Sequence, residues 1–443
     1  MDSAMYKKLA FSGLCLLLAS CSLFEKDKIA LDGERISVLD NESALQPDYA
    51  PGEVKIVLPR PEANTSWTQN GGNSEHLMGH LLTGNKLKAK WDSGFGEGSS
   101  RRDFLIASPV IAHKVVFTID AEAVVSAFRL DNGKKIWKRR LKPLNKDDKA
   151  ISMKGAGVAV MNKKVYATTG FGGVFALDMV SSKKIWRYDA ETPIRIAPTV
   201  AEDKVLVQTI DNLLIALNPE TGEELWRYKS SQEATVLVGG ASPAYSPKQD
   251  VVIAAFSTGE LRAFKASTGS PLWADILVSG KRKNSLTDIN AIKASPVIDG
   301  DRVYAVGNNN VLAAIDLRSG ARIWELEIGG VNQPWIAGKY LFVLSNDLDL
   351  LAVETASGKI VWNTKIPTGN SIEDKVGVFA TGPVLTDNRL LITTSNGYAF
   401  AVSPYTGKFL SFISLDDGVE LPPAVAYGYT VLTTKDAELL AYK

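Results

Sequence analysis

The sequence is poor in the side chains that most often carry out chemistry. Its 443 residues include only two cysteines and three histidines. Basic and acidic residues almost balance, and the net charge of +1 gives no overall field that would attract nucleic acid or another polyanion. No Gly-x-Ser-x-Gly elbow, phosphate-binding loop or paired metal motif is present. These absences argue against nucleic-acid binding and against the common hydrolase and nucleotide-binding classes.

Long apolar runs are also scarce, and none is long enough to predict a transmembrane helix. One apolar run, Leu9 to Leu18, follows two lysines and is typical of a signal-peptide core, so residues 1–20 are predicted to be a signal peptide. Met5 is an alternative start. The run ends in Leu-Ala-Ser-Cys, which resembles the bacterial lipobox, and we expect Cys21 to be lipidated. A plain secretory signal that happens to contain a cysteine is the alternative.

Cleavage before Cys21 would remove Cys15 and leave the exported domain without a free thiol or a disulfide. The domain would then be stabilised by burial alone, in a compartment that permits disulfides. Ser22 follows the cysteine, where Asp favours inner-membrane retention in lipoproteins that resemble this one, so we expect an outer-membrane location. Residues 21–66 are rich in proline and charge and are predicted to be a flexible tether.

A repeat organises the rest of the chain, residues 67–443. Each copy contains an alanine, a turn that usually ends in glycine, and a tryptophan, as in AIDLRSGARIW from Ala314 to Trp324. A second apolar element such as SPVIDGDRVYAV, which begins at Ser295, precedes each copy. Four short strands per unit, at intervals of roughly 40–50 residues, are the signature of a β-propeller blade. The copies begin at Ala127, Ala176, Ala216, Ala263, Ala314, Ala352, Ala401 and Ala441.

The conformation of the hairpin turn explains which residues recur in the repeat. Gly320 can adopt a positive φ at the end of a hairpin turn, and Asp316 can accept hydrogen bonds from turn N–H groups. One large aromatic side chain per blade is expected to fill the wedge between neighbouring sheets, which is a structural role. The seventh copy has Ser411 in place of the aromatic residue. The repeat tryptophans are Trp91, Trp137, Trp186, Trp226, Trp273, Trp324 and Trp362.

The eighth copy is cut short at Lys443 and lacks its fourth strand. The stretch from Leu87 to Trp91 resembles the missing strand, so we expect the N-terminal segment to complete the C-terminal blade. Such closure removes two exposed sheet edges. The predicted fold is therefore all-β, an eight-bladed propeller of four-stranded antiparallel blades. The polar, glycine-rich stretch from Ser66 to His80 is expected to lie over one face of the ring.

The repeat resembles that of pyrroloquinoline-quinone dehydrogenases, which implies a periplasmic quinoprotein enzyme as one hypothesis. Those enzymes need a Ca²⁺ site, an aspartate base and, in one branch, a vicinal disulfide. The repeated acids lie in hairpin turns of different blades and cannot converge on one ion, so no cofactor and no metal are expected. These acids are Asp131, Asp178, Asp316 and Glu354.

The histidines give a weak signal for a metal site. His76 and His80 are four residues apart, which on a helix could hold a metal ion, but their glycine-rich surroundings argue against a helix. His113 is expected to be exposed in a turn. The basic run from Lys281 to Lys283 is expected to be a solvated loop.

Two long loops depart from the period of the repeat and flank one blade. They are Tyr228 to Pro243 and Ile276 to Pro296, and each joins the last strand of one blade to the first strand of the next. We therefore expect them to emerge side by side on one face. Both mix apolar and polar residues, which suits protein–protein contact. The alternative is that the apolar side chains tuck under their own loops.

The lipobox, the tether, the eight repeats and the stretch LTDINAIKASPVIDGDRVYAV, from Leu286 to Val306, together resemble the BamB lipoprotein family of the outer-membrane β-barrel assembly (BAM) machinery. The resemblance implies a non-enzymatic scaffold that faces the periplasm from the outer membrane. It implies binding to the POTRA domains of BamA, to other BAM subunits and to unfolded outer-membrane protein clients.

The family's BamA contacts would fall on the two long loops. The family pattern L-x-L-R-G matches this chain at Leu237 but not at Thr235 or Val238, and L-S-D-V-D matches at Leu286 and Asp288. The contact would therefore depend more on apolar side chains here than in the family. A quinoprotein enzyme, and a propeller for cell-wall or other periplasmic partners, remain the alternatives. The residues expected to contact BamA are Val236, Leu237, Val238, Leu286, Asp288, Ile289 and Asn290.

Overall fold

The computed structural model describes residues 45–84, 87–144, 153–231, 238–279, 289–368 and 377–443. All but the first of these residues belong to one compact unit, Gln46–Lys443. The predicted signal peptide, Cys21 and most of the predicted tether lie outside the described residues. Within the described ranges no helix meets the length and hydropathy needed to cross a membrane.

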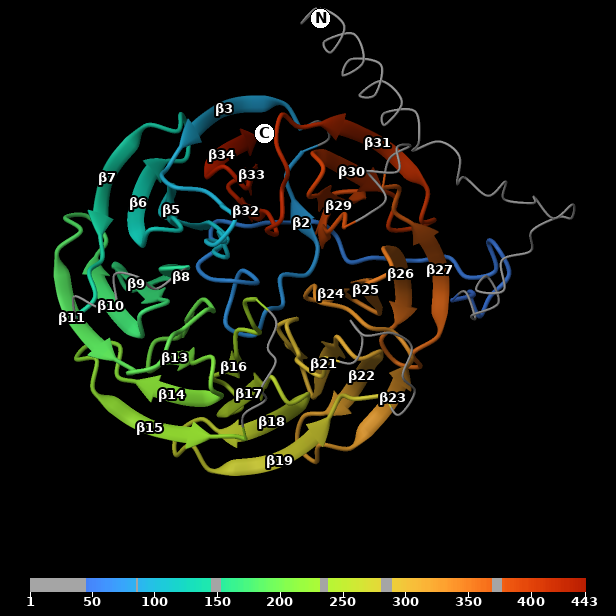
Figure 1. The fold of residues 1–443 in the computed structure, drawn as a ribbon. Helices are drawn as coiled ribbons and strands as arrows, with labels where there is room; N and C mark the ends of the chain where they lie inside the picture. Colours follow the sequence, from blue (N-terminus) through green and yellow to red (C-terminus); the bar gives the residue numbers. More distant parts are fainter. Residues whose placement is uncertain (1–44, 85–86, 145–152, 232–237, 280–288, 369–376) are drawn as a thin grey trace, which may run out of the picture. The chain divides into compact units, whose positions relative to one another are not determined.

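The compact unit is a ring of eight four-stranded antiparallel blades (Figure 1), as the repeat predicts. Within each blade the strands run in order from the ring's centre to its rim. Blade 1 comprises β4 (Val110–Ala112), β5 (Val115–Ile119), β6 (Val124–Arg129) and β7 (Lys135–Arg140); blade 2 comprises β8 (Gly155–Met161), β9 (Lys164–Thr169), β10 (Gly173–Asp178) and β11 (Lys184–Asp189); blade 3 comprises β12 (Thr199–Val200), β13 (Val205–Gln208), β14 (Leu213–Leu217) and β15 (Glu224–Lys229); blade 4 comprises β16 (Ala244–Ser246), β17 (Val251–Ala255), β18 (Glu260–Lys265) and β19 (Pro271–Ile276).

The second half of the ring repeats this arrangement. Blade 5 comprises β20 (Val297–Asp299), β21 (Arg302–Gly307), β22 (Val311–Asp316) and β23 (Arg322–Leu326); blade 6 comprises β24 (Trp335–Ala337), β25 (Tyr340–Leu344), β26 (Asp349–Glu354) and β27 (Ile360–Lys365); blade 7 comprises β28 (Ala380–Thr386), β29 (Arg389–Thr394), β30 (Tyr398–Val402) and β31 (Phe409–Ser414); blade 8 comprises β32 (Ala424–Ala426), β33 (Tyr429–Thr433), β34 (Glu438–Tyr442) and, at its rim, β3 (Ala89–Gly94).

Strand composition follows position in the blade. The two middle strands are β-branched and apolar and are almost completely buried, because sheets pack against both of their faces, as in β21 and β25. The rim strands are mostly exposed or half-buried, and most of them carry charges, as in β7. Hydrophobic burial between adjacent blades therefore supplies the core of the ring.

The N-terminal strand closes the ring, as predicted. β3 pairs antiparallel with β34, with Trp91 opposite Ala441. Lys88 and Lys443 extend this pairing by exchanging two backbone hydrogen bonds of 3.1 and 2.9 Å. Blade 8 is thus built from both ends of the described chain, and neither end leaves a strand edge open at the junction.

Seven repeat tryptophans connect their blades to the following ones. Every indole N–H donates a hydrogen bond of 2.8–3.1 Å to a backbone carbonyl in the hairpin turn of the following blade. Six of the seven indoles also pack against the positive-φ glycine of that turn, such as Gly320 beneath Trp273. The indole–carbonyl pairs are Trp91–Leu130, Trp137–Met179, Trp186–Pro219, Trp226–Ala266, Trp273–Leu317, Trp324–Thr355 and Trp362–Pro404.

The exception at Ser411 has a topological reason. Its blade precedes blade 8, in which the third strand, β34, and the rim strand, β3, are far apart in sequence. No hairpin turn joins these two strands, so blade 8 offers no turn glycine against which an indole at position 411 could pack. The side chain at this position is exposed instead.

The segment before β3 lies at the centre of the ring (Figure 1). It includes the short strands β1 (Glu62–Ala63) and β2 (Leu81–Leu82), which extend the sheet of blade 7. Rather than covering one face, it hydrogen-bonds in turn to the innermost strand, or to the residue beside it, in every blade. The contacts are Asn64–Tyr427, Trp67–Ile111, Thr68–Val160, Gln69–Val200, Ser74–Tyr245, Glu75–Ile298, Gly79–Trp335 and Leu81–Asp387.

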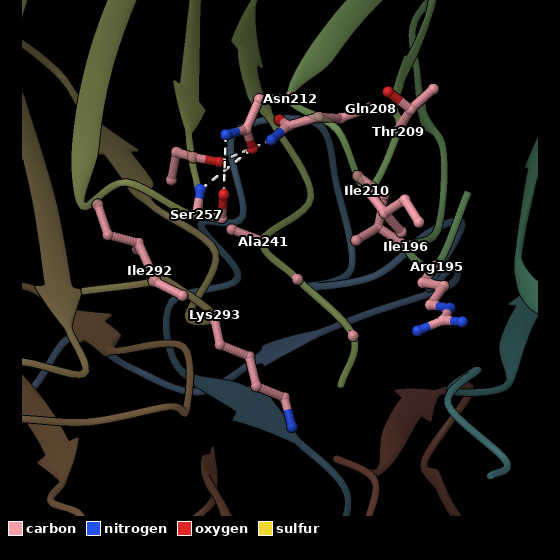
Figure 2. Close-up of a pocket in the computed structure, with 14 residues that line it drawn as sticks. Arg195, Ile196, Gln208, Thr209, Ile210, Asn212, Ala241, Ser257, Ile292 and Lys293 are labelled. Atoms are coloured by element: carbon pink, nitrogen blue, oxygen red, sulfur yellow. Dashed lines mark hydrogen bonds between the residues drawn. The ribbon is translucent and has the colours of Figure 1, made fainter. Parts of the chain in front are cut away.

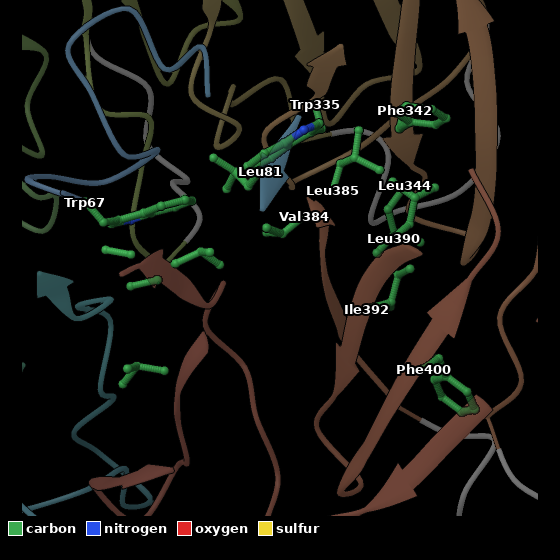
Figure 3. Packing of buried hydrophobic residues seen from close by; sticks show 14 of the residues in the cluster. Trp67, Leu81, Trp335, Phe342, Leu344, Val384, Leu385, Leu390, Ile392 and Phe400 are labelled. Carbon is green, nitrogen blue, oxygen red and sulfur yellow. The ribbon is translucent and has the colours of Figure 1, made fainter. Parts of the chain in front are cut away.

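Apolar side chains of this central segment join the largest core cluster (Figure 3). Trp67 stacks on Trp335 with ring centroids 6.2 Å apart, and both are about 95% buried or more. Leu81 lies beside Val384 and Leu385 of blade 7 in the same cluster. The segment is therefore an integral part of the core and fills the middle of the propeller.

Candidate partner-binding face

The two long interblade loops meet beside blade 4, as predicted from the repeat spacing. The first joins β15 to β16 and the second joins β19 to β20. Their described ends are tied together, because the Ser242 N–H donates to the Ser295 hydroxyl oxygen at 3.1 Å. The Asn70 amide donates to both of these serine hydroxyls, at 3.3 and 3.2 Å. The central segment therefore fixes the bases of both loops on one face.

A small hollow lies between the loop bases (Figure 2). Its volume is about 50 Å³, enough for one or two waters or the head group of one side chain. Small-molecule pockets are usually roughly 300–1,000 Å³, so this hollow does not fit a bound metabolite. The first loop contributes Gly239 to Ala241, the second contributes Ala291 to Lys293, the loop between β11 and β12 contributes Arg195 and Ile196, and blades 3 and 4 contribute the rest.

Polar contacts hold the back wall of the hollow in place. The Asn212 amide donates to Ser257 Oγ at 2.8 Å, and the Ser257 N–H donates to Asn212 Oδ1 at 3.2 Å. Gln208 donates to the Ala255 carbonyl at 2.9 Å. These bonds cross from blade 3 to blade 4, so the wall is rigid even though the loops above it are long.

Two cations, Lys293 and Arg195, line the hollow. In Figure 2, Lys293 extends from the chain after Ile292, and Arg195 extends from the opposite side. Burial lowers the pKa of both groups. Within the described ranges, Glu420 is the acid that partly offsets this effect on the pKa of Lys293, and no acid does so for Arg195. Among the described residues the Arg195 Nε atom is buried without a hydrogen-bond acceptor.

The predicted contact residues have different environments. Val238 is 39% exposed and stands at the edge of the described part of the first loop. The carbonyl of half-buried Ile289 accepts a hydrogen bond from Asn308 at 3.0 Å, and Asn290 accepts one from Asn309 at 2.9 Å. Ile292 is 3% exposed and packs under its own loop, the alternative considered for the apolar loop residues. Val236, Leu237, Leu286 and Asp288 lie outside the described residues.

The acids of the repeat act in their own turns, as predicted. Asp178 Oδ1 accepts the Ser181 N–H at 2.7 Å, and Asp316 Oδ1 accepts the Ser319 N–H at 2.7 Å. Asp131 pairs with Arg129, and Glu354 accepts the Ser357 hydroxyl. Hydrogen bonds from the Ser181 and Ser319 hydroxyls, followed by those from the N–H groups, lower the pKa of Asp178 and Asp316, so both carboxylates stay charged and fix the hairpin. Across the described ranges no three His, Cys, Asp or Glu side chains are grouped as metal ligands would be.

Two of the three histidines, His76 and His80, are buried in the central segment. His76 is 2% exposed, and its Nδ1 lies 2.7 Å from the Pro296 carbonyl oxygen. Burial lowers its pKa to about 4, so the ring is neutral at pH 7. His80 hydrogen-bonds to the carbonyl oxygens of Pro59 and Asp387. Neither histidine lies on a helix, and His113 is exposed in a turn with φ 51°.

Sequence reasoning missed the two cations of the hollow. Lys293 stands between Ile292 and Ala294, both buried, and a charged residue within such an apolar stretch was a usable signal. Arg195 comes from a different interblade loop, between β11 and β12, and nothing in the sequence places it near Lys293.

A family model described as "Outer membrane protein assembly factor BamB" matches residues 121–364, more than half of the chain. Proteins with that name in Yersinia pestis and Salmonella typhimurium are 27% and 26% identical to it. These matches cover 74% and 79% of this chain and 81% and 87% of the relatives. An uncharacterized Rickettsia prowazekii protein, RP232, is 29% identical, and that match covers 55% of this chain and 58% of the relative.

Solved structures show the same fold at low identity. The crystal structure of BamB from Moraxella catarrhalis superposes with a TM-score of 0.66 at 15% identity, over 81% of this chain and 100% of that one. The quinohemoprotein alcohol dehydrogenase ADHIIG from Pseudomonas putida gives 0.67 at 15% identity, over 86% and 80%. At this level of identity both likenesses concern the propeller alone.

Proposed function

The chain belongs to the BamB family of outer membrane protein assembly factors, and from this premise we propose that it is a non-enzymatic scaffold of the BAM complex. In this role it binds the periplasmic POTRA domains of BamA and assists the folding and insertion of β-barrel outer-membrane proteins. The proposed location is the periplasmic side of the outer membrane, with a lipid anchor at Cys21. The curated relatives named BamB support the assignment to the complex.

The proposed location of the partner-binding site rests on one observation: the two long loops meet at one hollow beside blade 4. Loops that depart from a repeat on a rigid scaffold are where binding residues concentrate. Here both loop bases are fixed by Asn70 and by the Ser242–Ser295 hydrogen bond. The bases of both loops are therefore ordered before a partner docks, which lowers the entropic cost of binding.

The charges of the hollow indicate the chemistry of the partner. Lys293 and Arg195 are both partly desolvated, and their lowered pKa values show that burial disfavours their charged forms. A carboxylate from the partner would restore the lost stabilisation, and charge-assisted hydrogen bonds are strongest where water is excluded. We therefore propose that an Asp or Glu of the POTRA surface enters the hollow, while apolar residues such as Val238 pack around it.

The test is a calorimetric titration of the chain against the purified POTRA array of the same organism's BamA. Wild-type chain is expected to show saturable binding that Leu237→Glu or Asp288→Arg weakens, although both positions lie outside the described residues. The matched control is Val180→Glu, since Val180 is 72% exposed in a hairpin of blade 2. Unchanged binding in both loop variants would exclude the site, and no binding by wild-type chain would exclude the partner.

The likeness to quinoprotein dehydrogenases suggests a second experiment. The purified chain would be mixed with pyrroloquinoline quinone and Ca²⁺ and assayed for a bound chromophore and for dehydrogenase activity. The scaffold proposal expects neither. Stoichiometric cofactor binding with turnover would replace the proposal by the enzymatic alternative.

A further inference from the structure

A row of lysines occupies three neighbouring blades at the level where their rim strands begin. In blades 8, 1 and 2 the positions three and two residues before the aligned tryptophan hold five lysines and no acid. The ten equivalent positions of blades 3 to 7, counted from Ser411 in blade 7, hold three cations and two acids. All five lysines are exposed. They form the lysine row: Lys88, Lys134, Lys135, Lys183 and Lys184.

Backbone hydrogen bonds show that the row lies at one level of the ring. In each of the three blades the carbonyl of the first lysine accepts the same N–H of the third strand, at 2.8–2.9 Å. The pairs are Lys134–Arg129, Lys183–Asp178 and, across the two chain ends, Lys88–Lys443. The rim strands β3, β7 and β11 follow one another around the ring (Figure 1). The row therefore lies along one side of the face that carries the hairpin turns, which we call the hairpin-turn face.

The positive charge of the row is not neutralised by nearby acids. Within the described ranges none of the five lysines forms a salt bridge. Of the acids in the adjacent turns, Asp131 pairs with Arg129, and Asp178 accepts hydrogen bonds from Val180 and Ser181 of its own turn. Because the whole chain carries only +1, the row is a local concentration of positive charge.

Apolar side chains project beside the row. Val180 is 72% exposed in the hairpin turn of blade 2, and Ile136 and Ile185 are 49% and 44% exposed. The Trp137 indole donates to the Met179 carbonyl at 3.0 Å, so the turn that carries Val180 lies against β7. Blades 3, 4 and 5 also expose an apolar residue at the position of Ile136, but only blades 1 and 2 precede it with two lysines. Cations beside exposed apolar side chains are typical of surfaces that lie among lipid headgroups.

The chain enters the ring on the same face. The Asp48 N–H donates to the Ile360 carbonyl at 2.8 Å, and the Ile360 N–H donates to Asp48 Oδ2 at 2.6 Å. Ile360 holds in blade 6 the position that Lys135 holds in blade 1. The residues between Cys21 and Asp48 can span at most about 100 Å. A lipid at Cys21 would therefore keep the hairpin-turn face within reach of the bilayer.

We propose that the lysine row and the apolar residues beside it dock the hairpin-turn face of blades 8, 1 and 2 on the anionic surface of a phospholipid bilayer. The lysines contact lipid phosphates, and Val180, Ile136 and Ile185 enter the headgroup layer. The inference rests on the proposed anchor at Cys21, which supplies the proximity. The hollow lies at the other end of the rim strands, where β15 and β19 lead into the two long loops. The bilayer and the POTRA domains therefore meet opposite faces of the ring.

The first test is cosedimentation with vesicles, using a chain that begins at Ser22 and carries no lipid. This chain retains the whole compact unit, Gln46–Lys443. It should bind vesicles of equal parts phosphatidylcholine and phosphatidylglycerol, and binding should fall as salt is raised. Pure phosphatidylcholine vesicles should bind it weakly. Each lysine near an anionic surface contributes about fivefold in affinity, so Lys135→Gln with Lys184→Gln should weaken binding roughly twentyfold.

The matched control removes the same charge from the hairpin turns of blades 4 and 5. Lys265→Gln with Arg318→Gln, both at exposed positions, should leave vesicle binding within about twofold of wild type. A second measurement uses the absence of cysteine after Cys21. An environment-sensitive dye at Val180→Cys should report an apolar surrounding on anionic vesicles, and the same dye at Leu272→Cys of β19 should not.

Three outcomes would overturn the proposal. They are no binding of wild-type chain to anionic vesicles, equal losses for the two double variants, and binding to soluble polyglutamate without binding to vesicles. The last result would indicate an acidic protein as the partner of the lysine row. No BamA is present in this assay and no lipid is present in the POTRA titration, so either proposal can fail alone.

Discussion

Gly320 lies directly against the indole of Trp273. A Cβ atom on this glycine would come within 2.6 Å of the Trp273 ring, and its φ of +75° is one that other residues adopt at a cost. The same indole donates a hydrogen bond to the Leu317 carbonyl at 2.8 Å. In most repeats, therefore, the turn glycine packs against the tryptophan of the preceding blade, and the tryptophan packs against the turn of the following blade.

The first prediction concerns this joint. Gly320→Ala should lower the free energy of unfolding by about 2–4 kcal/mol, because left-handed strain and overpacking against Trp273 add together. Gly300→Ala is the control, since Gly300 has φ +58° and open space where a Cβ would stand. It should lose only about 1 kcal/mol. Urea unfolding of both variants measures the difference, and equal losses would contradict the role assigned to the indole contact.

The second prediction tests the reason for Ser411. Trp324→Ala should cost about 3 kcal/mol or more, because it empties the wedge between blades 5 and 6 and removes the hydrogen bond to Thr355. Ser411→Trp should change the free energy of unfolding by less than about 0.5 kcal/mol. The new indole would meet no turn glycine in blade 8. A large stabilisation by Ser411→Trp would show that another surface can receive it.

The third prediction is a pH dependence due to His76. Its folded pKa is about 4, below the value of about 6.5 in an unfolded chain. Between these values the unfolded chain binds a proton that the folded chain does not, so stability is complete above pH 6.5 and falls as pH drops toward 4. The loss is of the order of 3 kcal/mol. His76→Gln should lose this part of the dependence in urea titrations at each pH; an unchanged slope would contradict burial of the neutral ring.

The fourth prediction concerns the central segment. Gln69 is 2% exposed and exchanges two hydrogen bonds with the backbone of Val200, at 2.7 and 3.1 Å. Gln69→Leu keeps the volume but leaves buried backbone groups unpaired, which should cost about 1–3 kcal/mol. Gln249→Leu removes an exposed hydrogen bond to Gly300 and should cost less than about 0.5 kcal/mol. Thermal or urea unfolding of both variants measures whether the central segment stabilises the propeller. Equal losses for the two variants would show that it does not.

The fifth prediction separates stability from binding at the hollow. Lys293→Met removes a cation that burial destabilises, so the free energy of unfolding should stay equal or rise by about 1 kcal/mol. The same variant should weaken POTRA binding about tenfold or more, because the partner's carboxylate loses its lysine. Opposite signs for stability and affinity are the signature of a binding residue. A loss of both would identify Lys293 as structural.

The propeller could be predicted from the sequence because its information is local and repeated. The turn glycine and the tryptophan recur in most copies, and the stretch from Leu87 to Trp91, which resembles the missing strand, indicated how the ring closes. The path of the central segment could not be predicted in this way. Its contacts, such as the two hydrogen bonds between Gln69 and Val200, are isolated hydrogen bonds to eight different blades and leave no periodic pattern.

The candidate face was predictable in its position but not in its chemistry. The repeat spacing locates two long loops beside one blade, and their bases do meet through Ser242 and Ser295. Arg195 and Lys293 converge only once blades 2 to 5 are arranged in the ring, because they come from loops about a hundred residues apart. Burial of Ile292 likewise depends on the packing of its loop against blade 4.

The most direct test of the central proposal is site-specific photo-crosslinking in the outer membrane. A photoreactive amino acid would replace Val238, which is 39% exposed and adjoins Gly239 of the hollow, or Val180, which is 72% exposed on blade 2. The proposed function predicts a crosslink to the POTRA region of BamA from position 238 and none from position 180. A crosslink from position 180 alone, or none from position 238 while the protein is folded, would contradict the assignment of this face to BamA.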